Sequence, residues 1–125
     1  TGSIRMVKGA YETPNGLSIE RGDKMDGIYL EYVEQLLSKN HKCSIASHHD
    51  KIHHETIKLI DKYKPTNYVL ERLLGIRNEE LEQFKSNGYN SRIYIVYGKE
   101  WYLYLCNRWA EYPLNIFQGI ADIVD

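Results

Sequence analysis

The sequence has little of several features that mark particular protein classes. It holds two cysteines in 125 residues, Cys43 and Cys106, too few for a disulfide framework, and a reducing cytosol fits best. The formal net charge is −1, which excludes the large field of one sign that points to nucleic acid or an anionic membrane. No apolar run approaches the roughly 20 residues that span a bilayer.

Several nucleotide-binding and hydrolase motifs are also missing. The chain has no GxGxxG, no GxxxxGK[ST] and no GxSxG, so a Rossmann site, a P-loop or a serine hydrolase is unsupported. What it has is 42% hydrophobic and 26% charged residues, which is ordinary for a globular domain with a real core. It also has eleven tyrosines, and clusters of tyrosine often line pockets or interfaces because the ring is apolar and its tip is polar.

Short apolar runs alternate with longer amphipathic ones along the chain. These runs predict strands over 3–10, 42–47, 67–73 and 91–97. The longer segments predict helices over 26–39, 50–63, 79–86 and 100–111, and a terminal helix over 114–124. Asp50 is expected to cap the second helix and Gly88 to end the third. One face of the first helix is expected to carry Ile28, Tyr32, Leu36 and Leu37.

Strands alternating with helices predict an α/β fold with a parallel sheet and right-handed crossovers. Four βα units plus a terminal helix amount to half of a TIM-type (β/α)8 barrel, which typically takes about 250 residues. A four-stranded open sheet is the alternative, and its edges would need cover. We expect residues 1–125 to form a single, partial barrel domain.

In a βα barrel the chemistry lies where strands end, which directs attention to the end of the first strand. There Arg5 and Val7 share one side of the strand, while Lys8 points the other way. An arginine in an otherwise buried strand is costly unless it is paired or bound to a ligand, and Gly9 permits close approach of a bound group. The structural alternative is a strand that ends in a surface lysine.

The second strand ends in Ala46-Ser47-His48-His49, and small, hydroxyl and imidazole side chains suit contact with a polar cofactor. His53 and His54 bring four histidines into seven residues, so a metal site is conceivable. No nearby cysteine or HExxH pattern supports it. Surface histidines are the favoured interpretation, and no metal site is predicted.

The last strand and helix carry Tyr97, Trp101, Tyr104 and Arg108 at helical or near-helical spacing. On the residues alone, a packed aromatic face with a partly covered arginine is the favoured interpretation. The functional alternative is an arginine that clamps a carboxylate in an aromatic-walled site.

Four segments taken together resemble the proline dehydrogenase family: RMVKGAY, IASHH, LLGIR, and RIYIVYG followed by WYLYLCNRWAEYP. The similarity covers nearly all of the chain, and RMVKGAY combined with the last pattern is specific. The resemblance implies the C-terminal half of a distorted (β/α)8 barrel, strands five to eight. It also implies that FAD is bound and that L-proline is oxidised to 1-pyrroline-5-carboxylate.

The resemblance further implies roles for individual residues. Arg5 matches a catalytic arginine beside the reactive nitrogen of the flavin. Positions expected to contact the cofactor are Arg5, Val7, Lys8, Gly9, Ala10, Ser47 and His48. Positions expected to contact the substrate are Leu73 and Tyr94 as walls of the proline ring, Tyr104 beside them, and Asn107 and Arg108 at the carboxylate.

The chain departs from the family pattern at several of its positions. Asn107 replaces the first arginine of the carboxylate-binding pair, and a neutral amide donates a hydrogen bond without the bidentate, charge-assisted grip. Glu71 stands where the family commonly has glutamine, and Val69 where it often has glutamate. The first four strands of the family barrel, with their substrate and FAD contacts, are absent, so we do not expect this chain alone to form a competent site.

Two functions therefore remain open from the sequence. The first is a partial proline dehydrogenase that self-associates or joins a complementary first-half chain. It would use a quinone-type electron acceptor and have a cytoplasmic location with peripheral contact at the inner membrane face, and it would not bind nucleic acid. The second is a non-catalytic half-barrel that serves as an interaction or assembly module. A flavin spectrum separates the two.

Overall fold

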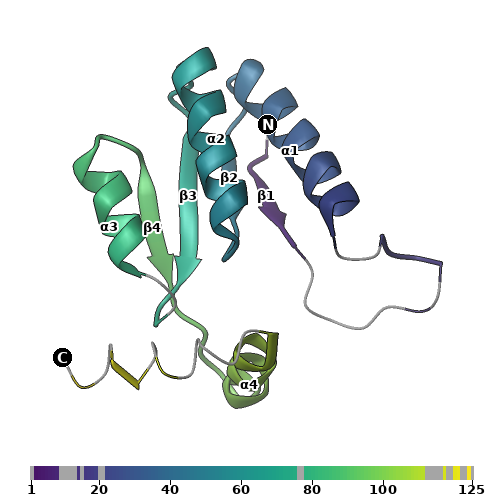
Figure 1. Cartoon of the computed structure of the whole chain (residues 1–125), viewed down its shortest axis with the longest axis vertical. Coiled ribbons are helices and arrows are strands. Elements are labelled where there is room, and N and C mark those ends of the chain that lie inside the picture. The colour runs from purple at the N-terminus through teal and green to yellow at the C-terminus, as the bar shows by residue number, and fades with distance from the viewer. Residues whose placement is uncertain are drawn as a thin grey trace. The chain divides into compact units, whose positions relative to one another are not determined.

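The elements of the computed structural model follow the alternation that the sequence predicts. The structure describes residues 2–8, 14, 16–19, 22–75, 78–111, 117, 120, 121 and 124, without the side chains of residues 108, 109 and 111. Among them, four strands alternate with four helices (Figure 1). The strands are β1 (Ile4–Val7), β2 (Cys43–Ala46), β3 (Tyr68–Leu73) and β4 (Ser91–Tyr94), and the helices are α1 (Asp23–Ser38), α2 (Asp50–Tyr63), α3 (Asn78–Ser86) and α4 (Trp101–Glu111).

The strands form a parallel sheet in the order β1-β2-β3-β4. Ile4 of β1 lies opposite Cys43 of β2. The Cys43 amide donates to the Asn67 carbonyl at 3.0 Å, and the Leu74 amide donates to the Tyr94 carbonyl at 2.9 Å. Parallel neighbours cannot be joined by a tight hairpin, and the helices supply the crossovers that they need. The α/β class and the sequential sheet are confirmed, and closure into a barrel stays a prediction.

Two compact units divide the chain inside β3, after Leu70. Unit 1, Thr1–Leu70, holds β1, α1, β2, α2 and the first part of β3. Unit 2, Glu71–Asp125, holds the last part of β3, then α3, β4 and α4. The assignment of residues 1–125 to one domain stays a prediction.

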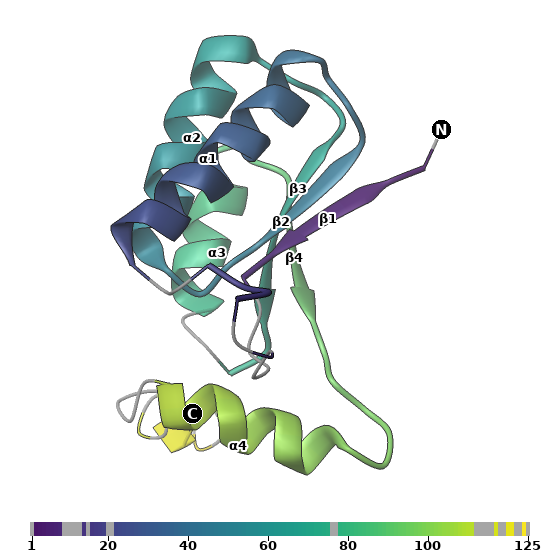
Figure 2. The ribbon, with the colours of Figure 1, turned by 90° about the vertical axis from the view of Figure 1, so that its right-hand side faces the viewer.

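In unit 1, α1 and α2 lie on the same face of β1 and β2 (Figure 2). The buried side chains of α1 recur every three or four residues: Asp26, Tyr29, Val33 and Leu37. Those of α2 also lie on one side of the helix, and they are Ile52, His53, Thr56 and Ile60. β2 is buried along its whole length, as an interior strand of a parallel sheet is. The expected inner face of α1 is partly wrong, because Leu37 is buried but Tyr32 is exposed.

Cys43 of β2 is buried, and this burial raises the pKa of its thiol. Because the thiolate is the reactive form, Cys43 should resist iodoacetamide in the folded chain and react once urea unfolds it. Cys106 of α4 is half-buried and should react first. Mass spectrometry of a Cys106→Ser variant isolates Cys43. Labelling of Cys43 in native buffer at its rate in urea would contradict the burial.

The ends of two helices test predictions from turn chemistry. The prediction that Asp50 caps α2 is wrong, because the cap is His49 in an extended conformation and Asp50 lies in the first turn. There its charge still favours the positive end of the helix. Gly88 ends the turn after α3 as predicted, with φ at +89°, and the Tyr89 amide donates back to the Phe84 carbonyl at 3.0 Å.

Asn40 ties the amino ends of β2 and β3 together in unit 1. It follows α1 in the left-handed conformation, φ +48°, which asparagine tolerates better than most residues. Its side-chain oxygen accepts the amides of Thr66 at 2.9 Å and Asn67 at 3.1 Å, just before β3. Its side-chain nitrogen donates to Thr66 Oγ1 at 3.1 Å. These bonds satisfy loop backbone groups that no strand partner reaches.

In unit 2, α3 packs against β4 and buries Leu81 and Phe84. β4 ends at Tyr94, short of the predicted end at Tyr97, because residues 95–97 leave the sheet and Tyr97 is 90% exposed. β1 likewise covers less than the predicted 3–10, and residues 9 and 10 lie outside the described residues. Most of the predicted terminal helix, 114–124, also lies outside them. In the described part of the chain, no helix has both the length and the apolarity to cross a membrane.

Candidate functional site

Polar side chains gather at the carboxyl ends of β1 and β2 in unit 1. Lys8 comes directly after β1, and Ser47, His48 and His49 come directly after β2. Since the two strands are parallel neighbours, their carboxyl ends meet at one edge of the sheet. The topology thus brings together Lys8, Ser47 and His48, which the sequence predicted as cofactor contacts.

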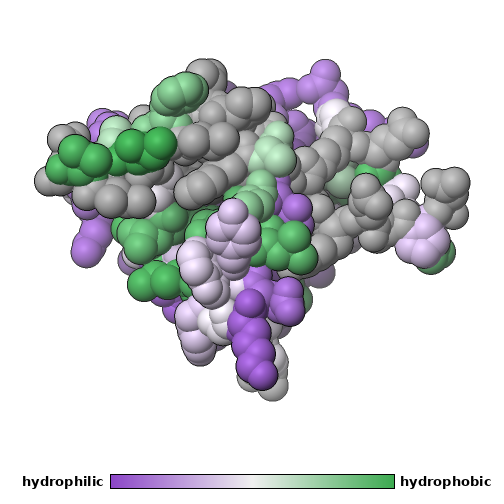
Figure 3. Space-filling model, turned by 90° about the horizontal axis from the view of Figure 1, so that it is seen from below, coloured by the Kyte–Doolittle hydropathy of each residue, from purple (hydrophilic) through white to green (hydrophobic). Residues whose placement is uncertain are grey.

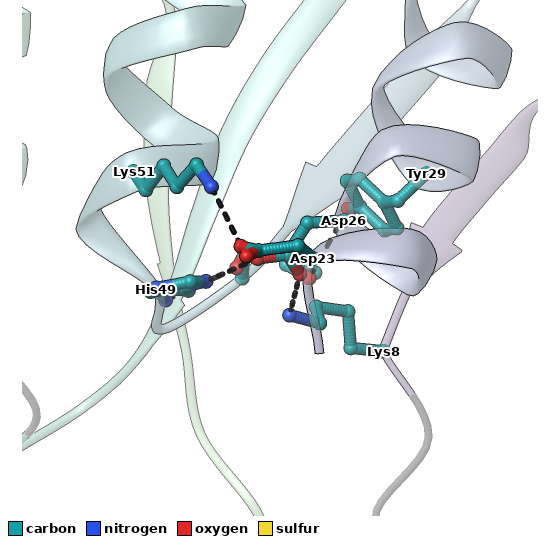
Figure 4. A network of polar contacts seen from close by, with 8 residues as sticks. Lys8, Asp23, Asp26, Tyr29, His49 and Lys51 are labelled. Carbon is teal, nitrogen blue, oxygen red and sulfur yellow. Dashed lines mark hydrogen bonds and ion pairs between the residues drawn. The ribbon is translucent and has the colours of Figure 1, made fainter. Parts of the chain in front are cut away.

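Asp26 of α1 lies between Lys8 and His49 of this group (Figure 4). Its side chain is 6% exposed, and its two oxygens have different partners. Oδ1 accepts from the Lys8 ammonium, and Oδ2 lies 3.2 Å from Nδ1 of His49. Tyr29, one turn along α1, donates its hydroxyl to the Met6 carbonyl at 2.9 Å. We call Lys8, Asp26 and His49 the Asp26 cluster.

A second ion pair lies at the rim of this cluster. Asp23 Oδ1 accepts from Lys51 Nζ at 3.0 Å, and the Asp23 side chain is 94% exposed (Figure 4). The hydrogen bond from Lys51, followed by its charge, lowers the pKa of Asp23, and the same bond raises the pKa of Lys51. Water and salt screen such an exposed pair, so it adds little to stability. The Asp26 carboxylate differs from that of Asp23 because it is buried, so it needs partners that offset the hydration it loses.

Arg5 and Val7 lie on the other side of β1 from this cluster. Side chains alternate along a strand, and Lys8 points toward α1, so Arg5 and Val7 point toward the face opposite α1. Both are exposed. The premise that Arg5 belongs to a buried strand is therefore wrong, because β1 is the edge strand of the sheet. Its expected catalytic role stays a prediction.

Ser47 and the histidines around it occupy different environments. Ser47 is buried, and its Oγ accepts the His49 amide at 3.1 Å, which leaves its own O–H to donate elsewhere. His48 is half-buried beside it. His53 is fully buried within α2, whereas Nδ1 of His54 meets the Asp50 carbonyl at 2.9 Å on the exposed side of the helix. Among the described residues, no three His, Cys, Asp or Glu side chains could hold a metal ion.

A second group of polar and aromatic side chains lies in unit 2. Arg92 Nε donates to Glu71 Oε1 at 3.0 Å, and its Nη2 contacts the same oxygen. Glu71 is 2% exposed, whereas Arg92 is 61% exposed. The Glu71 carboxylate is shielded from water, and a buried charge needs a partner. Arg92 supplies that partner as a positive charge. By the alternation of side chains, Leu73 shares the face of Glu71 and Tyr94 shares the face of Arg92.

Tyr94 also meets α4 on this face. The hydroxyls of Tyr94 and Tyr104 lie 3.4 Å apart, and both side chains are half-buried. Leu73 is buried. All five residues predicted to contact the substrate belong to unit 2, and two of them, Tyr94 and Tyr104, are in direct contact. An apolar wall with two hydroxyls suits a small molecule that has both apolar and polar parts.

The opposite face of β3 carries a different ion pair. Arg72 is completely buried, and its Nη2 donates to Glu80 Oε2 of α3 at 2.9 Å. Burial lowers the pKa of Arg72, and the charge of Glu80 opposes that shift. This pair joins strand to helix, and we assign it a structural role.

Four predicted positions remain: Asn107, Arg108, Gly9 and Ala10. Asn107 is exposed on α4. The Arg108 side chain, Gly9 and Ala10 lie outside the described residues. Their expected roles stay predictions.

Asp26 is the central residue that the sequence interpretation missed. The signal was present, because an acid at position 26 falls on the same helical stripe as Tyr29, Val33 and Leu37. An acid on a buried stripe needs a partner. His49, its second partner, was noted only as part of a histidine-rich segment.

Comparison with known proteins gives related sequences over nearly the whole chain. Over 123 residues it is 32% identical to proline dehydrogenase 2 of Bacillus subtilis strain 168, covering 94% of this chain and 41% of that protein. It is 31% identical over 123 residues to the proline dehydrogenase of Deinococcus radiodurans, covering 94% of this chain and 40% of that one. No protein-family model matches the chain. The chain spans about two fifths of the length of these relatives.

Proposed function

Because the chain belongs to the proline dehydrogenase family, we propose that it takes part in the FAD-dependent oxidation of L-proline to 1-pyrroline-5-carboxylate. In this proposal its four βα units are the C-terminal half of a (β/α)8 barrel. The observation that carries it is the meeting of Lys8, Ser47 and His48 at the carboxyl edge of β1 and β2. That edge is where βα barrels place their chemistry.

The donors at this edge fit a flavin nucleotide. FAD carries an anionic pyrophosphate and a ring with several acceptors, and Lys8, Ser47 and His48 offer an ammonium, a hydroxyl and an imidazole. An ammonium has three N–H donors, so the bond from Lys8 to Asp26 leaves further donors for a ligand. Val7, Gly9 and Ala10 complete the proposed contacts with the cofactor. When bound, the flavin supplies the two-electron acceptor for the reaction.

Arg5 has the proposed catalytic role. It lies on the other side of β1 from Lys8, and its guanidinium keeps its charge at any working pH. Beside the reacting atoms, this cation would stabilise negative charge that develops during proline oxidation. The orientation of Arg5 away from the Asp26 cluster supports separate tasks for Arg5 and Lys8.

Residues of unit 2 have the proposed role of binding proline. Leu73 and Tyr94 would wall the apolar ring, with Tyr104 held beside Tyr94 by the contact of their hydroxyls. Arg108 would hold the carboxylate, with Asn107 as a weaker donor. A fixed carboxylate aims the reacting carbon, and such orientation is a large part of catalysis.

Assembly with further barrel strands is part of the proposal. β1 is an edge strand, and an exposed edge offers backbone groups for pairing. Unit 2 exposes large apolar side chains, which include Ile95, Trp101 and Leu103, and Figure 3 shows apolar side chains at the surface. We propose that a complementary first-half segment, or a second copy, covers them. A quinone-type acceptor, a cytoplasmic location and peripheral membrane contact stay predictions.

The same exposed side chains favour a second candidate function, a non-catalytic assembly module. Exposed apolar surface fits docking whether or not a cofactor is present. The two candidates differ in whether the assembled protein holds flavin.

Co-expression of this chain with the part of the Bacillus subtilis relative outside the matched segment tests the proposal. We expect a complex that retains FAD and oxidises L-proline. Lys8→Met should weaken FAD binding by about 10- to 150-fold, the range for losing one charge-assisted contact of about 1.5–3 kcal/mol. Flavin absorbance and fluorescence titration measure this.

Lys42→Met is the control for the loss of a lysine charge, because Lys42 is exposed and precedes β2, whereas the half-buried Lys8 lies at the other end of the sheet. It should leave FAD affinity within about twofold, far below the effect of a charged contact. A stable complex without flavin would overturn the proposal and favour the assembly module.

A further inference from the structure

We propose that Asp26 is a positioning residue, which fixes the carboxyl ends of β1 and β2 relative to each other so that Lys8 and the Ser47–His48 segment meet the cofactor in one arrangement. The role in cofactor binding rests on the proposed function. The role in fixing the strand ends does not, and it can be tested separately.

The two oxygens of one carboxylate reach both strand ends. Oδ1 accepts from Lys8, which follows β1, and Oδ2 lies 3.2 Å from His49, which follows β2. A carboxylate is rigid and planar, so the distance between these partners is set by one group. His49 is adjacent to His48, and its amide donates to Ser47 Oγ at 3.1 Å. Holding His49 therefore also holds the proposed cofactor contacts beside it.

Tyr29 makes a parallel connection through the backbone. Its hydroxyl donates to the Met6 carbonyl at 2.9 Å and lies 3.4 Å from the Ala46 carbonyl. Met6 belongs to β1 and Ala46 ends β2. α1 thus contacts both strands twice, by the side chain of Tyr29 at the backbone and by Asp26 at the polar side chains (Figure 4).

Stability alone does not account for an acid at this position. The neighbouring members of the stripe, Val33 and Leu37, show what packing favours there. A buried carboxylate loses hydration, and its ion pairs recover that loss only with good geometry, so an apolar residue often does as well or better. The geometry that Asp26 imposes on Lys8 and His49 is what an apolar residue cannot supply.

The proposal also predicts a tautomer for His49. A carboxylate only accepts hydrogen bonds, so a His49 ring that Asp26 positions through the 3.2 Å contact is expected, in its neutral form, to carry its hydrogen on Nδ1. The His49 side chain is 40% exposed, so a spectroscopic probe reports the contact without disturbing the core.

Long-range ¹H–¹⁵N spectra of the 125-residue chain at about pH 8, above the ordinary pKa of histidine, read this tautomer directly. We expect the Nδ1–H form in the unaltered chain and loss of that preference in Asp26→Asn, because an amide can donate as well as accept. Asp23→Asn is the matched control, since Asp23 lies one turn earlier and pairs with Lys51 in solvent. It should keep the Nδ1–H form, because the charge interaction of Asp23 with His49 is smaller than its interaction with Lys51. An Nε2–H form in the unaltered chain overturns the inference even if Asp26→Asn fails to fold.

Flavin titration of the co-expressed complex tests the link to the cofactor. Asp26→Asn should weaken FAD binding by about tenfold or more, and Asp23→Asn by less than about twofold. Asp26→Glu keeps the charge but moves the carboxylate by one methylene, and it should weaken binding as Asp26→Asn does. Wild-type affinity in Asp26→Asn or Asp26→Glu overturns the inference. If no variant and no wild-type complex holds flavin, the proposed function fails, and the tautomer alone decides the role of Asp26.

Discussion

Replacing Arg108 with alanine in an active complex is expected to raise the KM for L-proline by about 10- to 150-fold, because one charge-assisted contact of about 1.5–3 kcal/mol is lost. The proposal places Arg108 at the substrate carboxylate, where a planar guanidinium can bind both oxygens at once. Steady-state kinetics of the co-expressed complex measure the change. Arg108→Lys should recover only part of the loss, since lysine has no planar fork.

Asn107 supplies the comparison for this prediction. Asn107→Ala should raise KM much less than Arg108→Ala, because a neutral amide contributes an ordinary hydrogen bond of about 1 kcal/mol. Asn107→Arg should lower KM, since it restores the arginine pair of the family pattern. An unchanged KM in Arg108→Ala would show that the substrate carboxylate binds elsewhere, and a packed aromatic face would then be the better interpretation of residues 97–108.

Removing the Glu80 carboxylate is expected to destabilise the chain by about 3 kcal/mol, at the lower end of the range for breaking a buried ion pair. Arg72 is completely buried, so Glu80→Ala leaves its guanidinium without this partner. Glu80 itself is 34% exposed, and water that reaches the site limits the loss. Urea unfolding followed by circular dichroism measures the change in free energy of unfolding.

Glu79→Ala is the matched control, because Glu79 also lies in the first turn of α3 but is exposed. Both variants lose the same interaction with the helix dipole, so their difference isolates the ion pair. Arg72→Met should be much milder than Glu80→Ala, since a long apolar side chain fills the space without a buried charge. Equal losses in Glu79→Ala and Glu80→Ala would show that the pair adds nothing to stability.

Much of the fold follows from the order of apolar runs along the chain. The strands around Ile45 and Leu70 and the helices that separate them were predicted because burial imposes a period on each segment. Burial of a particular face was harder to predict. In α1 the stripe with Tyr32 and the stripe with Val33 are both apolar, and only the packed neighbours decide that Val33 is buried and Tyr32 exposed. β1 looked interior by composition, but it has a strand on one side only.

Part of the candidate site could likewise be predicted from the sequence, and part of it could not. The approach of Lys8 and Ser47 follows from topology alone, because parallel neighbours align their carboxyl ends. The Asp26 cluster does not, since Asp26 lies 18 residues from Lys8 and the contact depends on how α1 is rotated about its axis. Sequence motifs name residues that meet a ligand, but they do not report the groups that orient those residues.

The hydrogen bonds of Asn40 have a consequence for how this chain can change over generations. They fasten the amino ends of β2 and β3, whereas Lys8 and His48 lie at the carboxyl ends in the same unit. Different residues therefore hold the strands together and form the candidate ligand contacts. A lineage can alter the exposed polar residues at the carboxyl ends, and with them the ligand, while the fastening around Asn40 preserves the strand order on which any new site would be built.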